Sequence, residues 1–140
     1  MREGKSGRVI VERLRRGDDV LERLNKIVVD NKVRGGSLMA IGSVAKAEIG
    51  FYEGNDRYAP ITCNGPLEVL SCVGSVSMKQ GVPIVHAHIT LADRKGRAYG
   101  GHVLPGCIVD PTFEVFIQET EGIALQRKLD AETNLYLLDT

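Results

Sequence analysis

The chain has 140 residues, of which 43% are hydrophobic and 26% charged, and this balance indicates one folded domain over residues 1–140 rather than a disordered segment. Lys plus Arg and Asp plus Glu each number 18, so no overall positive charge attracts the chain to nucleic acid. No apolar run is long enough to span a bilayer, and the first residues lack the apolar core of a signal peptide. We therefore expect a cytoplasmic protein with no membrane partner.

The first predicted elements are a strand and a helix. Residues 8–14, RVIVERL, are rich in β-branched side chains and predict a strand. Asp18 is a good N-cap for a helix over about residues 18–31. The apolar residues of this helix fall on one face that should pack against a sheet: Val20, Leu21, Leu24, Ile27 and Val28.

From Gly35 onward, short apolar runs are separated by Gly, Pro and Asn, which is typical of successive antiparallel strands. Residues 123–129 and 134–138 add two candidate strands at the end. The predicted fold class is therefore α+β, with a mainly antiparallel β-sheet that curls toward a barrel and packs with one main α-helix. The runs are SLMAIGSV, AEIGFY, PLEVLSCVGSVSM, PIVHAHITLA, YGGHVLPGCIV and FEVFIQET.

All three histidines lie in one stretch, VHAHITLADRKGRAYGGHVLPG, residues 85–106. Because side chains alternate along a strand, His86 and His88 project from the same face. The polar segment ADRKGRA predicts a hairpin connection. If the hairpin is symmetric about Lys95, His88 lies directly opposite His102, and all three rings converge on one side.

Three neutral imidazoles are a zinc ligand set, and zinc keeps an open fourth position for water or an exogenous small molecule when a protein supplies three. Another divalent transition metal would accept the same set. The prediction depends on register, since a shift by one residue would turn His102 to the other face. The competing interpretation is that His86, His88 and His102 are ordinary polar residues of an exposed face.

Further ligands or catalytic groups have weaker support in the sequence. Cys63, Cys72 and Cys107 are odd in number and widely spaced, which predicts reduced, buried thiols. Cys72 or Cys107 is an alternative fourth ligand. A metal-dependent hydrolase would also need a general base, and no carboxylate adjoins the histidines in sequence. Carboxylates that folding could bring near them are Glu68, Asp93, Asp110 and Glu114.

Five motifs occur in order along the chain: LRRGDDVLERL, IGSVAKAEIGFY, NGPLEVLSCVGSV, HAHITLAD and GGHV. Together they resemble the plant-and-prokaryote-conserved (PPC) domain family over about Val9 to Phe116, as in its stand-alone prokaryotic members, described as predicted DNA-binding proteins with a PD1-like motif. The resemblance implies an α+β fold and a homotrimer. Plant relatives are chromatin-associated regulators with a basic AT-hook ahead of this domain and a GRFEIL-like segment that supports partner interaction.

The chain departs from the plant pattern in two respects. It contains no AT-hook, and GPLEVL has Pro66 where the plant motif has Arg. The resemblance therefore implies a trimer more strongly than DNA binding, which we expect to be weak. We place the subunit interface at or near Leu67 to Val73, in the run GPLEVLSCVGSVSM, whose apolar residues are dense enough to bury both faces of a strand. The interface residues predicted there are Gly65, Leu67, Glu68, Val69 and Leu70.

Three functions stay open at this point. The first is a metal-binding trimeric module with a role in ligand sensing or assembly. The second is a small metal-dependent enzyme, and the third is a DNA-associated regulatory protein. The three-histidine hairpin favours the first two over the third.

Overall fold

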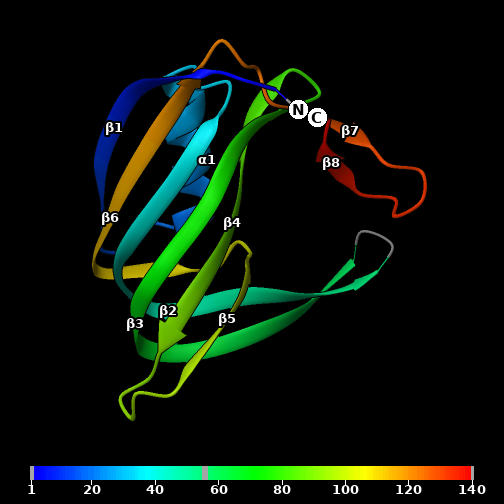
Figure 1. Cartoon of the computed structure of the whole chain (residues 1–140). Coiled ribbons are helices and arrows are strands. Elements are labelled where there is room, and N and C mark those ends of the chain that lie inside the picture. The colour runs from blue at the N-terminus through cyan, green and yellow to red at the C-terminus, as the bar shows by residue number, and fades with distance from the viewer. Residues whose placement is uncertain (1, 55–56, 140) are drawn as a thin grey trace.

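The computed structural model describes residues 2–54 and 57–139, which form one helix and eight strands (Figure 1). The predicted α+β class, with a mainly antiparallel sheet and one helix, is confirmed. The elements are β1 (Lys5–Arg15), α1 (Val20–Asp30), β2 (Gly36–Gly54), β3 (Arg57–Lys79), β4 (Val82–Ala92), β5 (Ala98–Val103), β6 (Ile108–Glu121), β7 (Gln126–Leu129) and β8 (Tyr136–Leu138).

The helix begins one residue later than predicted, with Asp19 and not Asp18 as its N-cap. Asp19 accepts a hydrogen bond from the Glu22 amide at 3.0 Å, whereas the Asp18 carboxylate accepts one from the Arg15 amide at 2.8 Å and closes the preceding turn. Asp18 thus closes the turn and Asp19 caps the helix, and the sequence alone does not show which of two adjacent aspartates takes which role.

The one helix of the described residues is too short and too polar to span a membrane.

Several predicted strands are parts of longer ones. SLMAIGSV and AEIGFY are both in β2, and β3 begins at Arg57 rather than at Pro66. Pro66 lies at a bulge, where the pairing shifts between Val44 opposite Leu67 and Lys46 opposite Asn64. A bulge tolerates proline because its missing N–H is not required by the ladder. The run YGGHVLPGCIV is divided between β5 and β6 by a turn.

The strands are ordered β1-β6-β2-β5-β4-β3-β7-β8, and β2 also pairs with β3, so β2, β5, β4 and β3 close into a barrel. The predicted curling toward a barrel is thus confirmed. All pairings between named strands are antiparallel except the short one of β3 with β7, where Met78 lies beside Gln126. This contact attaches the C-terminal β7–β8 hairpin, which projects from the rest of the sheet in Figure 1.

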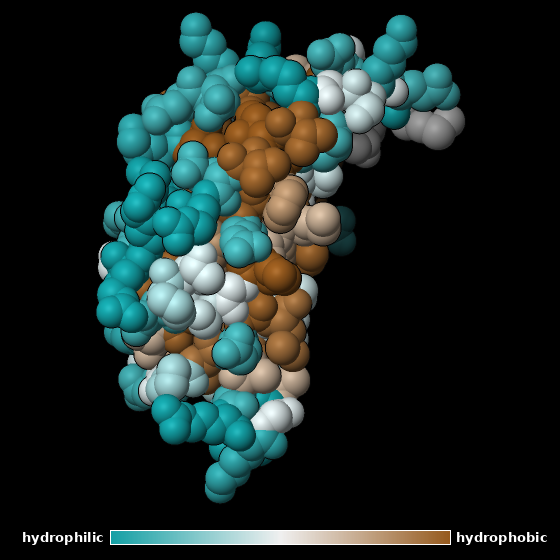
Figure 2. Space-filling model, turned by 90° about the vertical axis from the view of Figure 1, so that its left-hand side faces the viewer, coloured by the Kyte–Doolittle hydropathy of each residue, from teal (hydrophilic) through white to brown (hydrophobic). Residues whose placement is uncertain are grey.

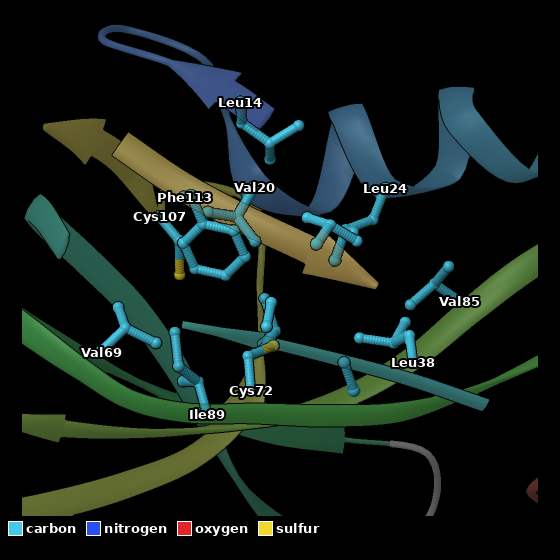
Figure 3. Close-up of a cluster of buried hydrophobic side chains, with 14 of the residues drawn as sticks. Leu14, Val20, Leu24, Leu38, Val69, Cys72, Val85, Ile89, Cys107 and Phe113 are labelled. Carbon is cyan, nitrogen blue, oxygen red and sulfur yellow. The ribbon is translucent and has the colours of Figure 1, made fainter. Parts of the chain in front are cut away.

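The core lies between α1 and the inner face of the sheet (Figure 3). Val20, Leu24, Ile27 and Val28 are buried, as the helical stripe predicts. Asn25 ties the helix to the sheet, because its Oδ1 accepts a hydrogen bond from the Val85 amide of β4 at 2.9 Å.

The outer face of the sheet carries an exposed apolar row. Directly paired residues share a face, and the pairings Val11–Phe116, Phe116–Met39 and Met39–Val73 cross four strands. These four residues, the outer apolar row, are 62%, 39%, 62% and 54% exposed. Figure 2, seen from the β1 side, shows apolar side chains gathered in a band. Contiguous exposed apolar residues of this kind are typical of interaction surfaces.

Candidate metal centre

The β4–β5 hairpin has the predicted register, with His88 paired with His102. Asp93 holds the turn, since its Oδ1 accepts hydrogen bonds from the amides of Lys95 at 2.8 Å and Arg97 at 3.1 Å. Gly100 lets the two strands approach closely, because a Cβ there would collide with the carbonyl oxygen of Ile89. The hairpin is therefore closed in the one register that places His102 with His88.

The three imidazoles converge on one side of the sheet. Ring centroids are 5.3 Å apart for His86 and His88, 5.0 Å for His86 and His102, and 5.6 Å for His88 and His102. One ring nitrogen of each lies within 4.8 Å of those of the other two. Tetrahedral zinc with Zn–N bonds of about 2.0–2.1 Å needs nitrogens about 3.3–3.4 Å apart, so an inward movement of at most about 1.5 Å assembles the set.

The same cross-strand pairing fixes where the site lies in the fold. His88 pairs with Val73, which places His88 and His102 at the end of the outer apolar row. His88 is exposed, whereas His86 and His102 are partly buried. The Tyr58 ring stacks on His102 with centroids 4.4 Å apart and 21° between the planes. The histidines thus lie on the face of the sheet that α1 does not cover.

Burial favours the neutral imidazoles that a metal requires. It lowers the pKa of His102 to about 4, with smaller contributions from His86, His88 and the positive charge of Arg127. The pKa of His86 is also lowered, mainly by burial and then by Arg127. At neutral pH a metal ion therefore has no proton to displace from His86 or His102.

One ring nitrogen of the cluster has no hydrogen-bond partner among the residues that the structure describes. Within residues 2–54 and 57–139, Nδ1 of His102 is buried and receives no hydrogen bond. Buried polar atoms are nearly always paired, so an unpaired nitrogen on one of three converging imidazoles fits a site for a metal ion. The residues present therefore fit the group that the histidine spacing predicts.

Arg127 of β7 adds a positive charge that the sequence analysis missed. Its Nη2 lies 3.2 Å from Nδ1 of His86, and its Nε donates to Oγ of Ser77 at 2.7 Å. No local motif marks QRKL as part of a site, because only the non-local pairing of β7 with β3 brings Arg127 to β4. Tyr58 and Tyr136 were missed for the same reason, since both border this site from segments far from the histidines in sequence.

The other candidate ligands lie elsewhere. Cys63, Cys72 and Cys107 are free and buried, as predicted. Burial raises the pKa of Cys72 to about 12 and that of Cys107 to about 11, so both thiols stay protonated in the core. Of the candidate carboxylates, Glu68, Asp93 and Asp110 border a separate depression and Glu114 borders another.

The predicted interface segment is divided between the two faces of β3. Leu67 and Val69 are only 2% and 3% exposed and belong to the core of their own subunit. Gly65, Glu68 and Leu70 are exposed, with Leu70 at 53%. Only these three are therefore available to another chain.

Comparisons with known proteins agree with this fold. The family model described as the Plants and Prokaryotes Conserved (PCC) domain matches residues 1–121. A curated relative, "Bifunctional protein GlmU" of Synechococcus sp. strain JA-3-3Ab, is 28% identical over 127 residues, which are 90% of this chain and 19% of that protein. The chain thus spans about a fifth of the length of this curated relative.

Solved structures cover almost the whole chain. The metal-containing protein AF0104 of Archaeoglobus fulgidus is 32% identical, with a TM-score of 0.88 over 99% of this chain and 97% of its own. A plant- and prokaryote-conserved protein of Pyrococcus horikoshii is 28% identical, with a TM-score of 0.90 over 99% and 95%. A "Putative DNA-binding protein" of Ralstonia eutropha JMP134 is 30% identical, with a TM-score of 0.83 over 93% and 90%.

The low pKa of His102 predicts that the metal-free protein loses stability as the pH falls from 6.5 to about 4. In this window the unfolded chain, with its ordinary imidazole, binds more protons than the folded chain. The free energy of unfolding therefore rises with pH across the window and is lost on acidification. Urea unfolding of the metal-free protein at several pH values should show a shallower slope in His102→Gln than in the wild type. Thr90→Ala, on the neighbouring strand, should keep the wild-type slope, and equal slopes in all three proteins would contradict the prediction.

Proposed function

The chain belongs to the Plants and Prokaryotes Conserved domain family, and within that family we propose that it is a trimeric metal-binding module. His86, His88 and His102 hold one divalent transition metal ion per chain, with zinc the favoured ion. The fourth coordination position is left to water or to a small molecule. The metal would therefore serve ligand sensing or assembly. It would not be a purely structural zinc site, because such a site has four protein ligands.

One observation carries the proposal: three imidazoles from two paired strands converge within 4.8 Å, and a buried nitrogen of His102 has no partner among the described residues. Ordinary surface histidines would not need two partly buried rings, His86 and His102, at the cost of a strongly lowered pKa for His102. The name of the A. fulgidus relative, a metal-containing protein, supports the same reading.

The open side of the cluster supports a ligand role. A cavity lies beside His86 and His102, bordered by Tyr58, Arg127 and Tyr136. A small molecule there could reach the fourth position of the metal without passing through the core. A site of this kind binds metal and ligand together, which is the property that sensing requires.

We predict that the purified protein binds about one zinc ion per chain and that His88→Ala abolishes this binding. His88 is exposed, so its removal leaves no cavity in the core. The loss should exceed about 100-fold, more than the about 10- to 100-fold cost of losing a group that only orients a ligand. Titration calorimetry with zinc, together with elemental analysis, measures it. The control Thr90→Ala should bind as the wild type does, and unchanged zinc affinity in His88→Ala would refute the site.

The trimer rests on the outer apolar row and on the exposed part of the GPLEVL segment. Leu70 and Val73 project from β3 on exposed positions, and Met39 lies opposite Val73. A single short helix covers only the other face of the sheet, so this face needs a further partner. Packing around a threefold axis would cover it in all chains at once, with Gly65 and Glu68 at the margin of the contact.

Light scattering should give a mass of about 46 kDa, three times the 15.3 kDa of one chain, over the micromolar range. Leu70→Glu should lower this mass toward that of one chain and lower the melting temperature with it. Leu129→Glu is the matched control, since Leu129 is 54% exposed against 53% for Leu70. Val69→Glu should unfold the subunit, because Val69 lies in the core. A wild-type monomer would end the proposal of a trimer.

A DNA-associated role is the second candidate function. The name of the R. eutropha relative and the descriptions of the family's prokaryotic members support it. The charge of this chain does not add to that support, because its formal net charge is +0 and it lacks an AT-hook.

We predict that the protein binds duplex DNA weakly and without sequence preference. Binding should disappear as salt is raised, since phosphate contacts dominate non-specific affinity. Fluorescence anisotropy with A·T-rich and G·C-rich duplexes at about 50 and 200 mM salt measures this. Tight, sequence-selective binding at the higher salt would make the DNA-associated role the leading one.

A further inference from the structure

We propose that the cavity beside the three histidines binds a small carboxylate, whose carboxylate group is held by Arg127 and completes the coordination of the metal ion. This inference rests on the proposed metal site and assigns the chemical class of its ligand.

The cavity joins the barrel to the C-terminal hairpin. Its volume is about 210 Å³, below the about 300–1,000 Å³ of pockets for drug-sized molecules, so it suits a molecule of a few carbon atoms. One wall carries the ring edges of His86 and His102 and the guanidinium of Arg127. Apart from Lys79, the remaining lining residues are apolar or aromatic: Tyr58, Ile84, Val85, Leu135, Tyr136 and Leu137.

Among residues 2–54 and 57–139, no carboxylate neutralises the positive charge in this cavity. Lys79 lies over the Tyr136 ring at 4.2 Å from its centroid, and Arg127 is half-buried. Among the described residues, neither makes a salt bridge, and no carboxylate borders the cavity. Three neutral imidazoles leave a divalent ion with its full charge. A metal ion next to Arg127 therefore increases an imbalance that a bound anion removes.

The hydrogen bonds of Arg127 show how an anion would be received. Its Nη1 donates to the Tyr136 carbonyl at 2.9 Å, and its Nη2 donates to Oγ of Ser75 at 3.3 Å. With Ser77 and His86, all four acceptors are uncharged. These contacts fix the plane of the guanidinium, so little side-chain entropy remains to be lost when a ligand binds.

Metal binding would break the hydrogen bond between Arg127 and His86 and so free one Nη2 hydrogen of Arg127. Arg127 can only donate, so Nδ1 of His86 is the acceptor in their 3.2 Å contact. A neutral imidazole has a single lone-pair nitrogen, and when that pair goes to a metal ion the ring can no longer accept from Arg127. The freed Nη2 hydrogen is then available to an anion in the cavity, which Arg127 lines. Metal and anion therefore bind with positive coupling.

The walls of the cavity select a carboxylate over a phosphate. A carboxylate can place one oxygen on the metal ion and accept the freed Nη2 hydrogen of Arg127 with the other, while a short hydrocarbon body packs on Leu135 and Leu137. A phosphate would place polar oxygens against these apolar walls. Both Arg127 and Tyr136 lie beyond residue 121, where the family match ends, so family membership alone does not imply this subsite.

Calorimetric titration of propionate into the zinc-loaded protein tests the inference. The wild type should bind propionate, and Arg127→Gln should bind it at least tenfold more weakly while zinc still binds at about one ion per chain. Lys128→Gln is the matched control, because Lys128 is on the same strand and pairs with Asp139. Propionamide, a neutral analogue of similar shape, should not bind. Removal of zinc should weaken propionate binding by about 5- to 150-fold, the usual range of coupling between two sites.

Each of the other outcomes contradicts one named part of the proposal. Equal propionate affinity in the wild type and Arg127→Gln, equal binding of propionamide, or tighter binding of inorganic phosphate overturns the carboxylate subsite and leaves the metal site standing. Absence of zinc binding overturns the proposed function. Arg127-dependent propionate binding to the metal-free chain would then support an anion cavity alone, and its absence would overturn both. If Arg127→Gln fails to fold, the visible spectrum of the cobalt-loaded wild type decides, since propionate at the metal must change it.

Discussion

The carboxylate of Asp93 accepts the amides of Lys95 and Arg97 and also pairs with the Arg97 guanidinium at 2.6 Å, which closes the β4–β5 connection in one register. The Arg97 side chain and these amides hold the pKa of Asp93 below its usual range, so the Asp93 carboxylate stays charged at neutral pH. Side chains alternate along a strand, and a slip of one residue would turn His102 into the core. The geometry of the whole histidine cluster therefore depends on one turn.

The same alternation separates the two faces of the sheet. Leu38 and Ile117 are buried in the core, whereas their neighbours Met39 and Phe116 are exposed on the outside. His88 continues this outer row through its pairing with Val73. In the proposed metal-binding trimer, the metal site would adjoin the partner chain that covers the outer apolar row, so subunit packing and metal coordination would share one surface. This arrangement suits a role in which assembly and ligand binding influence each other.

Local patterns predicted the parts of this structure that depend on local geometry. The helix, the hairpin register and the facing of His88 to His102 follow from periodicity and turn chemistry. The sequence did not show that Leu67 and Val69 face the core, because an apolar run does not reveal which of its residues point inward. The register shift of β3 between Val69 and Ser71 adds to this ambiguity. Arg127 could not be found from the sequence, since its approach to the histidines depends on pairing between strands distant along the chain.

The charge balance of the site connects its chemistry with its fold. Three uncharged ligands would bind a metal ion without neutralising it, and the acceptors of Arg127 among the described residues are uncharged as well. Arg127 belongs to the β7–β8 hairpin, which is joined to the barrel by the short parallel contact with β3. An anion bridging the metal and Arg127 would therefore tie this hairpin to the histidine wall. Because coupling is reciprocal, a change that loosens the hairpin should weaken anion binding and, with it, the mutual stabilisation of metal and anion.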